Sequence, residues 1–416
     1  MKIQQRILTM LMATFVVALS NSTVLAAIAP AKWVGSWATS QQLPEPRNML
    51  SGDDVSDATL RQVVRLSAGG KRIRIVFSNA FGNAPMRIDV AHVAESESVA
   101  SSRIKVSTDH VITFDGGNDV IIPAGADYTS DPIEMPVAAL TSLTISFHVP
   151  ETIQLQTGHP GSRATSYIMR GNKVAELELP DAKRIDHWYQ ISAVHVETDT
   201  NAGAIVTLGD SITDGHGATT NGNNRWPDQL ADRLQSSPKT RGVSVLNHGI
   251  GGNRLLLDGL GPNALARFDR DVIAQPGVKW VIVLEGINDL GTLTREAPVS
   301  AEKHALLVKR MIAAYSQMVA RAHDHGIKVI GATILPDATS AYYHPDAANE
   351  ADRNAVNDWI RTPGHFDVVI DFDRITRDPE HLERLLPKYD SGDGLHPSPE
   401  GFRVMAEAFP LSLFDK

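Results

Sequence analysis

Short runs of alternating apolar and polar residues fill the first half of the chain. Residues 60–66 and 72–77 are two such runs, and the segment Ser67-Ala-Gly-Gly-Lys71 between them is typical of a hairpin turn. Further strands are expected at residues 86–93, 111–114, 120–122 and 143–149, and helical spacing is absent between them. Because closely spaced short strands without long helices pack as two sheets, the pattern predicts an all-β, jelly-roll-like sandwich over residues 31–198.

Apolar runs alternate with helical segments in the second half of the chain. Strands are expected at residues 204–208, 243–246, 280–284, 328–334 and 368–372. Helices are expected to begin near Trp226, Pro262, Ala301, Ala347 and Pro399. Strands that are apolar without alternation are buried on both faces, so the pattern predicts a three-layer α/β/α domain with a mainly parallel sheet over residues 199–416.

Aromatic residues of the predicted sandwich permit two interpretations. Trp33, Trp37, Tyr167, Trp188 and Tyr189 are able to stack on sugar rings, but packing in a core is the commoner use of such side chains. Residues 33–39 place two tryptophans on one strand face, which favours docking against a partner domain over sugar binding. His159 lies in a Gly-His-Pro-Gly turn, and we expect a solvated loop residue there rather than part of an active-site rim.

The N-terminus has the pattern of an export signal. Lys2 and Arg6 precede an apolar run at residues 7–19, and small residues follow in Val24-Leu25-Ala26. This order predicts a cleaved signal peptide over residues 1–26 and a secreted or periplasmic protein. No later stretch approaches the roughly 20 apolar residues that a membrane span requires.

Composition narrows the function classes. The chain has no cysteine, which excludes disulfides and thiolate metal ligands. Its net charge is -9, and no run of lysine or arginine is long enough to follow a phosphate backbone, so nucleic acid is not an expected partner.

One stretch offers a nucleophile. The apolar run at residues 204–208 breaks at Gly209 and is followed by Asp210 and Ser211. Sites in parallel α/β sheets lie beyond the carboxyl ends of the strands, so Ser211 is the candidate nucleophile. Gly209-Asp-Ser-Ile-Thr-Asp-Gly215 lacks the Gly-Lys-Ser/Thr ending of a phosphate loop, and no Gly-x-Gly-x-x-Gly follows the first strand.

Three further blocks follow in order, at residues 247–253, 286–289 and 393–396. With the serine block they resemble the SGNH hydrolases, also called the GDSL esterase and lipase superfamily, and most closely its bacterial secreted members with two domains. The resemblance spans residues 204–409 and implies a flavodoxin-like fold and a serine hydrolase.

Asp393 and His396 are the candidate partners of Ser211. A serine hydroxyl attacks well only when an imidazole takes its proton, and a carboxylate must hold that imidazole in the right tautomer. The spacing of three residues, with Gly392 and Gly394 in the turn, allows the carboxylate to reach Nδ1 of His396. The plainer alternative is that Asp393 caps the next helix and His396 is a surface residue.

By the resemblance, the oxyanion of the reaction intermediate is bound by the backbone N–H of Ser211, the backbone N–H of Gly252 and the side-chain amide of Asn288. Gly251 is the alternative to Gly252, which is preferred because it comes five residues after Asn247. Asp210, Asp214 and Asp289 are expected to cap helices and turns, and His248 to be structural or to touch substrate. His323 and His325 face different directions on a helix end, so no metal site and no cofactor are expected.

These inferences predict a serine esterase that works through an acyl-enzyme. The resemblance covers carbohydrate O-acetyl esterases, arylesterases, thioesterases and lipases. The export signal and the added β-domain favour O-acetyl groups on polysaccharides or oligosaccharides. A catalytically silent carbohydrate-binding protein is the alternative from another class, and a two-carboxylate glycoside hydrolase leaves Ser211, Asn288 and His396 without roles.

Overall fold

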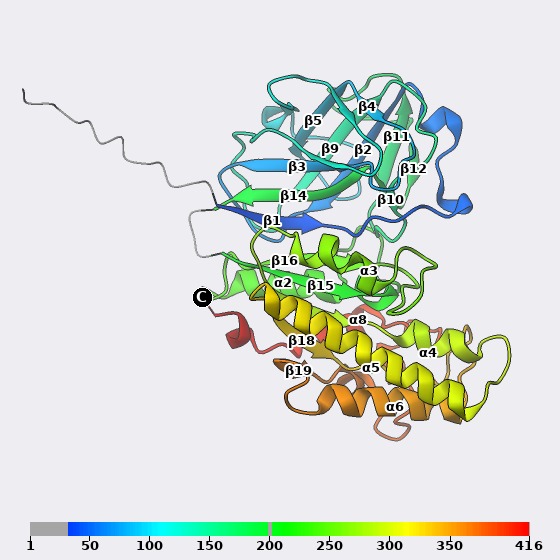
Figure 1. The fold of residues 1–416 in the computed structure, drawn as a ribbon. Helices are drawn as coiled ribbons and strands as arrows, with labels where there is room; N and C mark the ends of the chain where they lie inside the picture. Colours follow the sequence, from blue (N-terminus) through cyan, green and yellow to red (C-terminus); the bar gives the residue numbers. More distant parts are fainter. Residues whose placement is uncertain (1–31, 199–201, 416) are drawn as a thin grey trace, which may run out of the picture. The chain divides into compact units, whose positions relative to one another are not determined.

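Two antiparallel sheets form the first half of the chain (Figure 1). The computed structural model describes residues 32–198 and 202–415, so the predicted signal peptide lies outside the described residues. One sheet has the order β1 (Trp33–Ala38), β14 (Ile191–Glu197), β3 (Ile73–Ser78) and β8 (Asp127–Thr129). The other has the order β12 (Lys183–Ile185), β11 (Ser166–Arg170), β2 (Ala58–Arg65), β9 (Ser142–Val149), β5 (Val90–Glu95) and β6 (His110–Ile112).

Both sheets bury their inner faces in one apolar core. Phe77 of β3 and Phe147 of β9 are fully buried and meet edge to face, with ring centroids 5.4 Å apart. Two short pairs complete this half: β4 (Met86–Ile88) with β7 (Val120–Ile122), and β10 (Gly158–His159) with β13 (Trp188–Tyr189). The antiparallel β-rich domain predicted before residue 198 is therefore present.

A five-stranded parallel sheet organises the second half. Its order is β16 (Ser244–Gly249), β15 (Ala204–Gly209), β17 (Val278–Leu284), β18 (Lys328–Ala332) and β19 (Val368–Ile370). In chain order this is the flavodoxin-like arrangement, in which connections leave in opposite directions from the first strand. Ser211 follows that first strand, β15, so the predicted fold and the position of the candidate nucleophile agree.

Helices pack in two groups. One group contains α2 (Trp226–Ser236), α7 (Phe372–Thr376) and α8 (Pro399–Glu407). The other contains α3 (Ala264–Phe268), α4 (Ile287–Thr294), α5 (Ala301–Asp324) and α6 (Ala347–Arg361). The short helices α1 (Ser211–Asp214), α4 and α7 were not predicted, because a helix of one or two turns has too few residues to show a period. No helix in the described ranges has the length and apolar run that a membrane span needs.

The two tryptophans of β1 have different environments. A β-bulge between Gly35 and Trp37 shifts the register of β1 against β14. Trp37 lies edge-on against Trp188 and lines a crevice between the two halves, whereas Trp33 packs under the guanidinium of Arg74. The bulge breaks the two-residue alternation on which the predicted docking role of the two tryptophans rested, and Trp37 belongs to the core of the sandwich where that core meets the crevice.

β1 joins the sandwich to the α/β half. Val34 and Ala38 are buried in the core of the α/β half, and the N–H of Gly35 donates to the carbonyl of Pro276. A Cβ at Gly35 would lie 2.8 Å from the side chain of Leu246, so a larger residue in β1 would require this side chain of β16 to move.

Candidate active site

The turn after β15 presents Ser211. A Cβ at Gly209 would lie 2.1 Å from Oγ1 of Thr213 and 2.7 Å from the carbonyl oxygen of Leu284, so only glycine allows this turn. Asp210 then caps α1 by accepting the N–H of Ile212 at 2.9 Å. Ser211 is left at the first position of α1 with 7% of its surface exposed.

Ser211, His396 and Asp393 form a continuous hydrogen-bonded chain. Oγ of Ser211 lies 2.8 Å from Nε2 of His396, and Nδ1 of His396 lies 2.6 Å from Oδ2 of Asp393. The sequence predicted this grouping, and the structure brings the three side chains together across 185 residues.

A tight loop holds the carboxylate of Asp393. Its Oδ1 accepts the backbone N–H groups of Leu395 and His396, while Gly392 and Gly394 adopt left-handed φ angles of 107° and 71°. Burial opposes ionisation of Asp393, but the bonds from the side chain and backbone of His396 outweigh it and hold the pKa of Asp393 well below its usual range. Ser398 caps α8, so Asp393 is not the helix cap of the plainer alternative.

Two backbone N–H groups, those of Ser211 and Gly252, are available to a substrate. Neither the N–H of Ser211 nor that of Gly252 donates to another group in residues 32–198 and 202–415. The N–H of Gly251, by contrast, donates to Oδ2 of Asp214 at 3.1 Å. The contacts therefore favour Gly252 over Gly251 as an oxyanion donor.

The amide of Asn288 is fixed from both ends. Its Nδ2 donates to the carbonyl of Asn253 at 2.8 Å, and its Oδ1 accepts the hydroxyl of Tyr343 at 2.6 Å. These partners orient the amide and leave its second N–H without a protein acceptor in the described part of the chain. Asn288 lines the same cavity as Ser211 and Gly252.

Arg267 connects the loops around the site, a role that no motif in the sequence indicates. The fully buried guanidinium donates to the carbonyls of Gly209 at 2.9 Å and His248 at 2.6 Å, and to Oδ1 of Asn253 at 3.0 Å. These groups belong to the ends of β15 and β16 and to the loop that carries Gly252. Arg267 thus holds together the segments that present Ser211, Gly252 and Asn288.

Buried carboxylates lie beneath the site. Burial raises the pKa of Asp210 to about 7 and that of Asp289 to about 6. It also raises the pKa of Glu285, which contacts Arg267 at 3.2 Å. Asp289 accepts the N–H groups of Leu255 and Leu256, so Asp210 and Asp289 have the structural roles that the sequence predicted.

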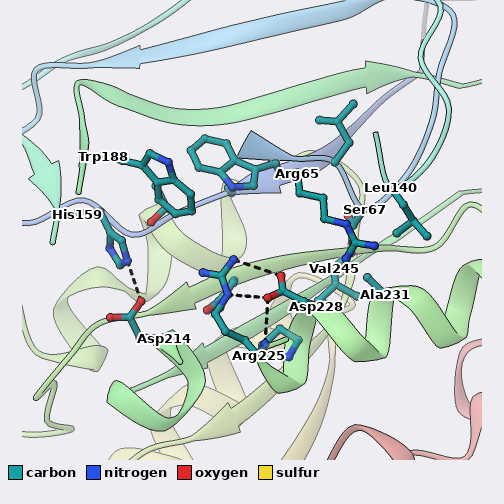
Figure 2. Close-up of a pocket in the computed structure, with 16 residues that line it drawn as sticks. Arg65, Ser67, Leu140, His159, Trp188, Asp214, Arg225, Asp228, Ala231 and Val245 are labelled. Carbon is teal, nitrogen blue, oxygen red and sulfur yellow. Dashed lines mark hydrogen bonds and ion pairs between the residues drawn. The ribbon is translucent and has the colours of Figure 1, made fainter. Parts of the chain in front are cut away.

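His159 is not the solvated loop residue that the sequence predicted. It is 2% exposed, and its Nε2 lies 2.8 Å from Oδ1 of Asp214, the last residue of α1 (Figure 2). Its Nδ1 pairs with the carbonyl of Ser40 at 2.9 Å. The expectation was wrong because its partner comes from the other half of the chain, which no local pattern reveals. His248 is likewise buried, with Nδ1 3.1 Å from Oγ of Ser40.

Both halves line a cavity of about 630 Å³ around Ser211. The sandwich half contributes Gln42, Glu45, Arg47, Asn48, Pro160, Gly161, Arg163 and His187. His216, which the sequence analysis did not single out although it directly follows the serine block, packs on His396 with ring centroids 4.0 Å apart.

Ligand atoms of His216, Asp393 and His396 lie within 4.8 Å of one another, as in a potential metal site. Both ring nitrogens of His396 are already engaged by Ser211 and Asp393, and Nδ1 of His216 accepts a hydrogen bond from Arg163 at 3.2 Å. These nitrogens are therefore committed to hydrogen bonds, which does not fit a metal centre.

Comparisons with known proteins agree with this geometry. A model of the GDSL-like lipase/acylhydrolase family matches residues 207–404, a range that contains all of the candidate catalytic residues. The search of curated proteins found no match.

Solved structures match about half of this chain. A GDSL-like lipase from Bacteroides thetaiotaomicron is 22% identical, with 49% of this chain and 84% of that chain covered and a TM-score of 0.36. An acetylxylan esterase from Geobacillus stearothermophilus, solved as a catalytic mutant, is 24% identical, with 51% and 94% covered and a TM-score of 0.39. The family match and the arrangement of the four motifs show that residues 207–404 are similar to the GDSL-like lipase/acylhydrolase family of the SGNH hydrolase superfamily.

Proposed function

We propose that this protein is a serine esterase that hydrolyses carboxylic esters through an acyl-enzyme. The observation that carries the proposal is the chain of contacts from Oγ of Ser211 through the ring of His396 to Asp393, at 2.8 and 2.6 Å. Nucleophile, base and orienting carboxylate are the three groups that acyl transfer from an ester requires.

In the first half-reaction, Oγ of Ser211 attacks the ester carbonyl while Nε2 of His396 takes its proton. Asp393, whose pKa lies well below its usual range, stays ionised and stabilises the imidazolium that forms. The N–H groups of Ser211, Gly252 and Asn288 donate to the oxyanion. One such donor typically contributes about 10²–10³ in kcat.

The first half-reaction ends when His396 gives the proton to the departing alcohol, whose exit leaves the acyl group on Ser211. In the second half-reaction, His396 takes a proton from a water molecule as its oxygen attacks the acyl carbon. His396 then gives this proton to Oγ of Ser211 while the bond between Oγ and the acyl carbon breaks, which releases the carboxylic acid and restores the serine. The proposed route needs no cofactor.

Short acyl groups on a carbohydrate are the proposed substrate. Most residues that line the cavity have polar or charged side chains, and Pro160, Leu260 and Leu395 are its aliphatic members. A long acyl chain needs an extended apolar channel, whereas an acetyl group on a sugar suits a wide cavity with many polar groups. We also propose that the protein is exported, on the basis of Lys2, Arg6 and the apolar run that follows them.

The test is hydrolysis of a p-nitrophenyl ester series, from acetate to palmitate, together with acetate release from acetylated xylan. Ser211→Ala is the matched control. The proposal predicts activity on acetate and xylan that the control abolishes. A preference for long chains would replace it with a lipase or thioesterase, and no turnover of any ester by the folded wild type would contradict the enzyme assignment.

A further inference from the structure

We infer that the active-site cavity selects esters whose alcohol part carries a carboxylate close to the ester bond. This inference rests on the proposed esterase function and names the substrate class of the same site. Four arginines line the cavity, namely Arg47, Arg163, Arg254 and Arg295. The chain as a whole has a net charge of -9, so this concentration of positive charge runs against its overall balance.

Of the carboxylates that line the cavity, only Glu45 pairs with one of these arginines: it contacts Arg47 at 2.9 Å. Asp214 is engaged by His159 and by the N–H of Gly251. Asp393 is engaged by His396. Arg163, Arg254 and Arg295 therefore have no carboxylate partner within the cavity.

Arg163 reaches from the sandwich half to His216, the residue that packs on His396. One of its terminal nitrogens donates to Nδ1 of His216, whose ring packs on His396. Its Nε is buried without an acceptor, and it makes no ion pair with any described residue. Its φ of 49° is left-handed, a conformation that a long side chain rarely adopts and that costs on the order of 1 kcal/mol or more. The loop thus holds an unneutralised guanidinium beside the catalytic histidine.

Arg254 and Arg295 face the cavity from the α/β half. Arg254 follows Gly252 by two residues, and its guanidinium donates to the backbone carbonyl of Asp258. Its charge also interacts with the carboxylates of Asp258 and Asp289, although it forms a hydrogen bond with neither. Arg295 donates to the hydroxyl of Tyr342 at 3.1 Å and pairs with Glu296, whose side chain is 84% exposed. Because water screens the exposed carboxylate of Glu296, most of the positive charge of Arg295 remains available to a ligand.

Guanidinium groups in this arrangement match a carboxylate. Arginine binds a carboxylate through paired N–H donors, and such bonds are strongest where water is partly excluded. Arg163 contacts the His216 ring that packs on His396, and it would meet the alcohol part of the ester, since His396 protonates the leaving oxygen. An acetylated uronic acid and an aromatic acetoxy acid both present this chemistry, a carboxylate near an acyl oxygen.

The test compares two esters that differ in charge: 4-acetoxybenzoate and its neutral amide, 4-acetoxybenzamide. The readout is the ratio of kcat/KM for the anionic and neutral esters in wild type, Arg163→Gln, Arg254→Gln and the control Arg310→Gln, on the exposed face of α5. We expect the ratio to fall by about tenfold or more in the first two variants and to stay within about twofold in the control. Added salt should lower the ratio in wild type more than in these two variants.

A second pair of substrates tests whether the carboxylate of the substrate belongs to a sugar. Acetylated polygalacturonate should release acetate faster than acetylated xylan if the carboxylate belongs to a sugar, and the two arginine variants should remove that preference.

An unchanged ratio in both arginine variants, with normal turnover of the neutral ester, would overturn the inference and leave the esterase assignment intact. If Arg163→Gln lowers kcat/KM equally for both esters, Arg163 supports His216 and does not bind the carboxylate. The ratio of kcat/KM in Arg254→Gln would then decide whether the cavity selects anionic esters. No turnover of either ester by wild type would instead remove the proposed function and the inference with it.

Discussion

The two walls of the active-site cavity carry different chemistry. The α/β wall holds Ser211, His396 and the proposed oxyanion donors, and the sandwich wall holds Arg163 and, behind it, the buried contact of His159 with Asp214. The groups proposed to make and break bonds thus all come from the α/β half, whereas the sandwich half contributes charge and support without reactive groups. Substitutions of the reactive groups should therefore change the rate, and substitutions on the sandwich wall should change selectivity or stability.

The largest effects should come from the α/β wall. We expect His396→Ala to lower kcat by about 10⁶-fold and Asp393→Asn by about 10⁴-fold, because the first removes the base and the second only misorients it. Steady-state kinetics on p-nitrophenyl acetate measures both. Equal losses in the two variants, or a loss below about tenfold in either, would contradict the assigned roles.

Next in size is the effect of Asn288. Removal of its amide in Asn288→Ala should lower kcat by about 10²–10³ with little change in KM, because the lost bond forms only to the oxyanion. Tyr343→Phe keeps the amide but removes the hydroxyl that orients it, and should cost on the order of tenfold. A loss confined to KM in Asn288→Ala would assign this residue to substrate binding instead.

On the sandwich wall, His159→Ala should act on stability. It leaves the buried carboxylate of Asp214 without its imidazole partner, which we expect to lower the free energy of unfolding by about 3 kcal/mol. His92→Ala is the matched control, since His92 and Asp109 form a more exposed pair within the sandwich at 2.9 Å. Urea unfolding of both variants measures the loss in the free energy of unfolding. An equal loss in His159→Ala and His92→Ala would contradict the prediction that the contact between the halves contributes more to stability.

The smallest effect concerns pH. Burial lowers the pKa of His248 to about 4, so between pH 4 and its ordinary pKa of 6.5 the unfolded chain binds a proton that the folded chain does not. Stability must then fall as the pH falls through this window. From about pH 6.5 to about pH 5, wild type should lose about 1.5 kcal/mol relative to His248→Gln. The same change in the free energy of unfolding between the two pH values in wild type and His248→Gln would contradict this.

Short motifs made the reactive residues predictable. Asp393 and His396 lie in one turn, and Ser211 directly follows a buried strand, so their positions depend on local spacing and strand order. The parallel sheet was predictable for the same reason, because its strands are apolar without alternation. Each of these features can be recognised within a window of a few residues.

The contacts between the halves were not predictable in this way. His159 pairs with a residue 55 positions away, and Arg267 joins three loops through backbone carbonyls and an amide oxygen, which leave no signature in the sequence. His216 and Arg163 meet across 53 residues. Such contacts depend on how the sandwich packs on the α/β half, which no short motif in the sequence specifies.

Covalent labelling of Ser211 is the most direct test of the proposed esterase. The native protein is treated with a serine-directed phosphonate ester, and the adduct is located by mass spectrometry of its peptides. We predict one adduct per chain, on Ser211, that forms much more slowly in His396→Ala. An adduct on another residue, or none on the folded wild-type protein, would contradict the assignment of Ser211 as the nucleophile.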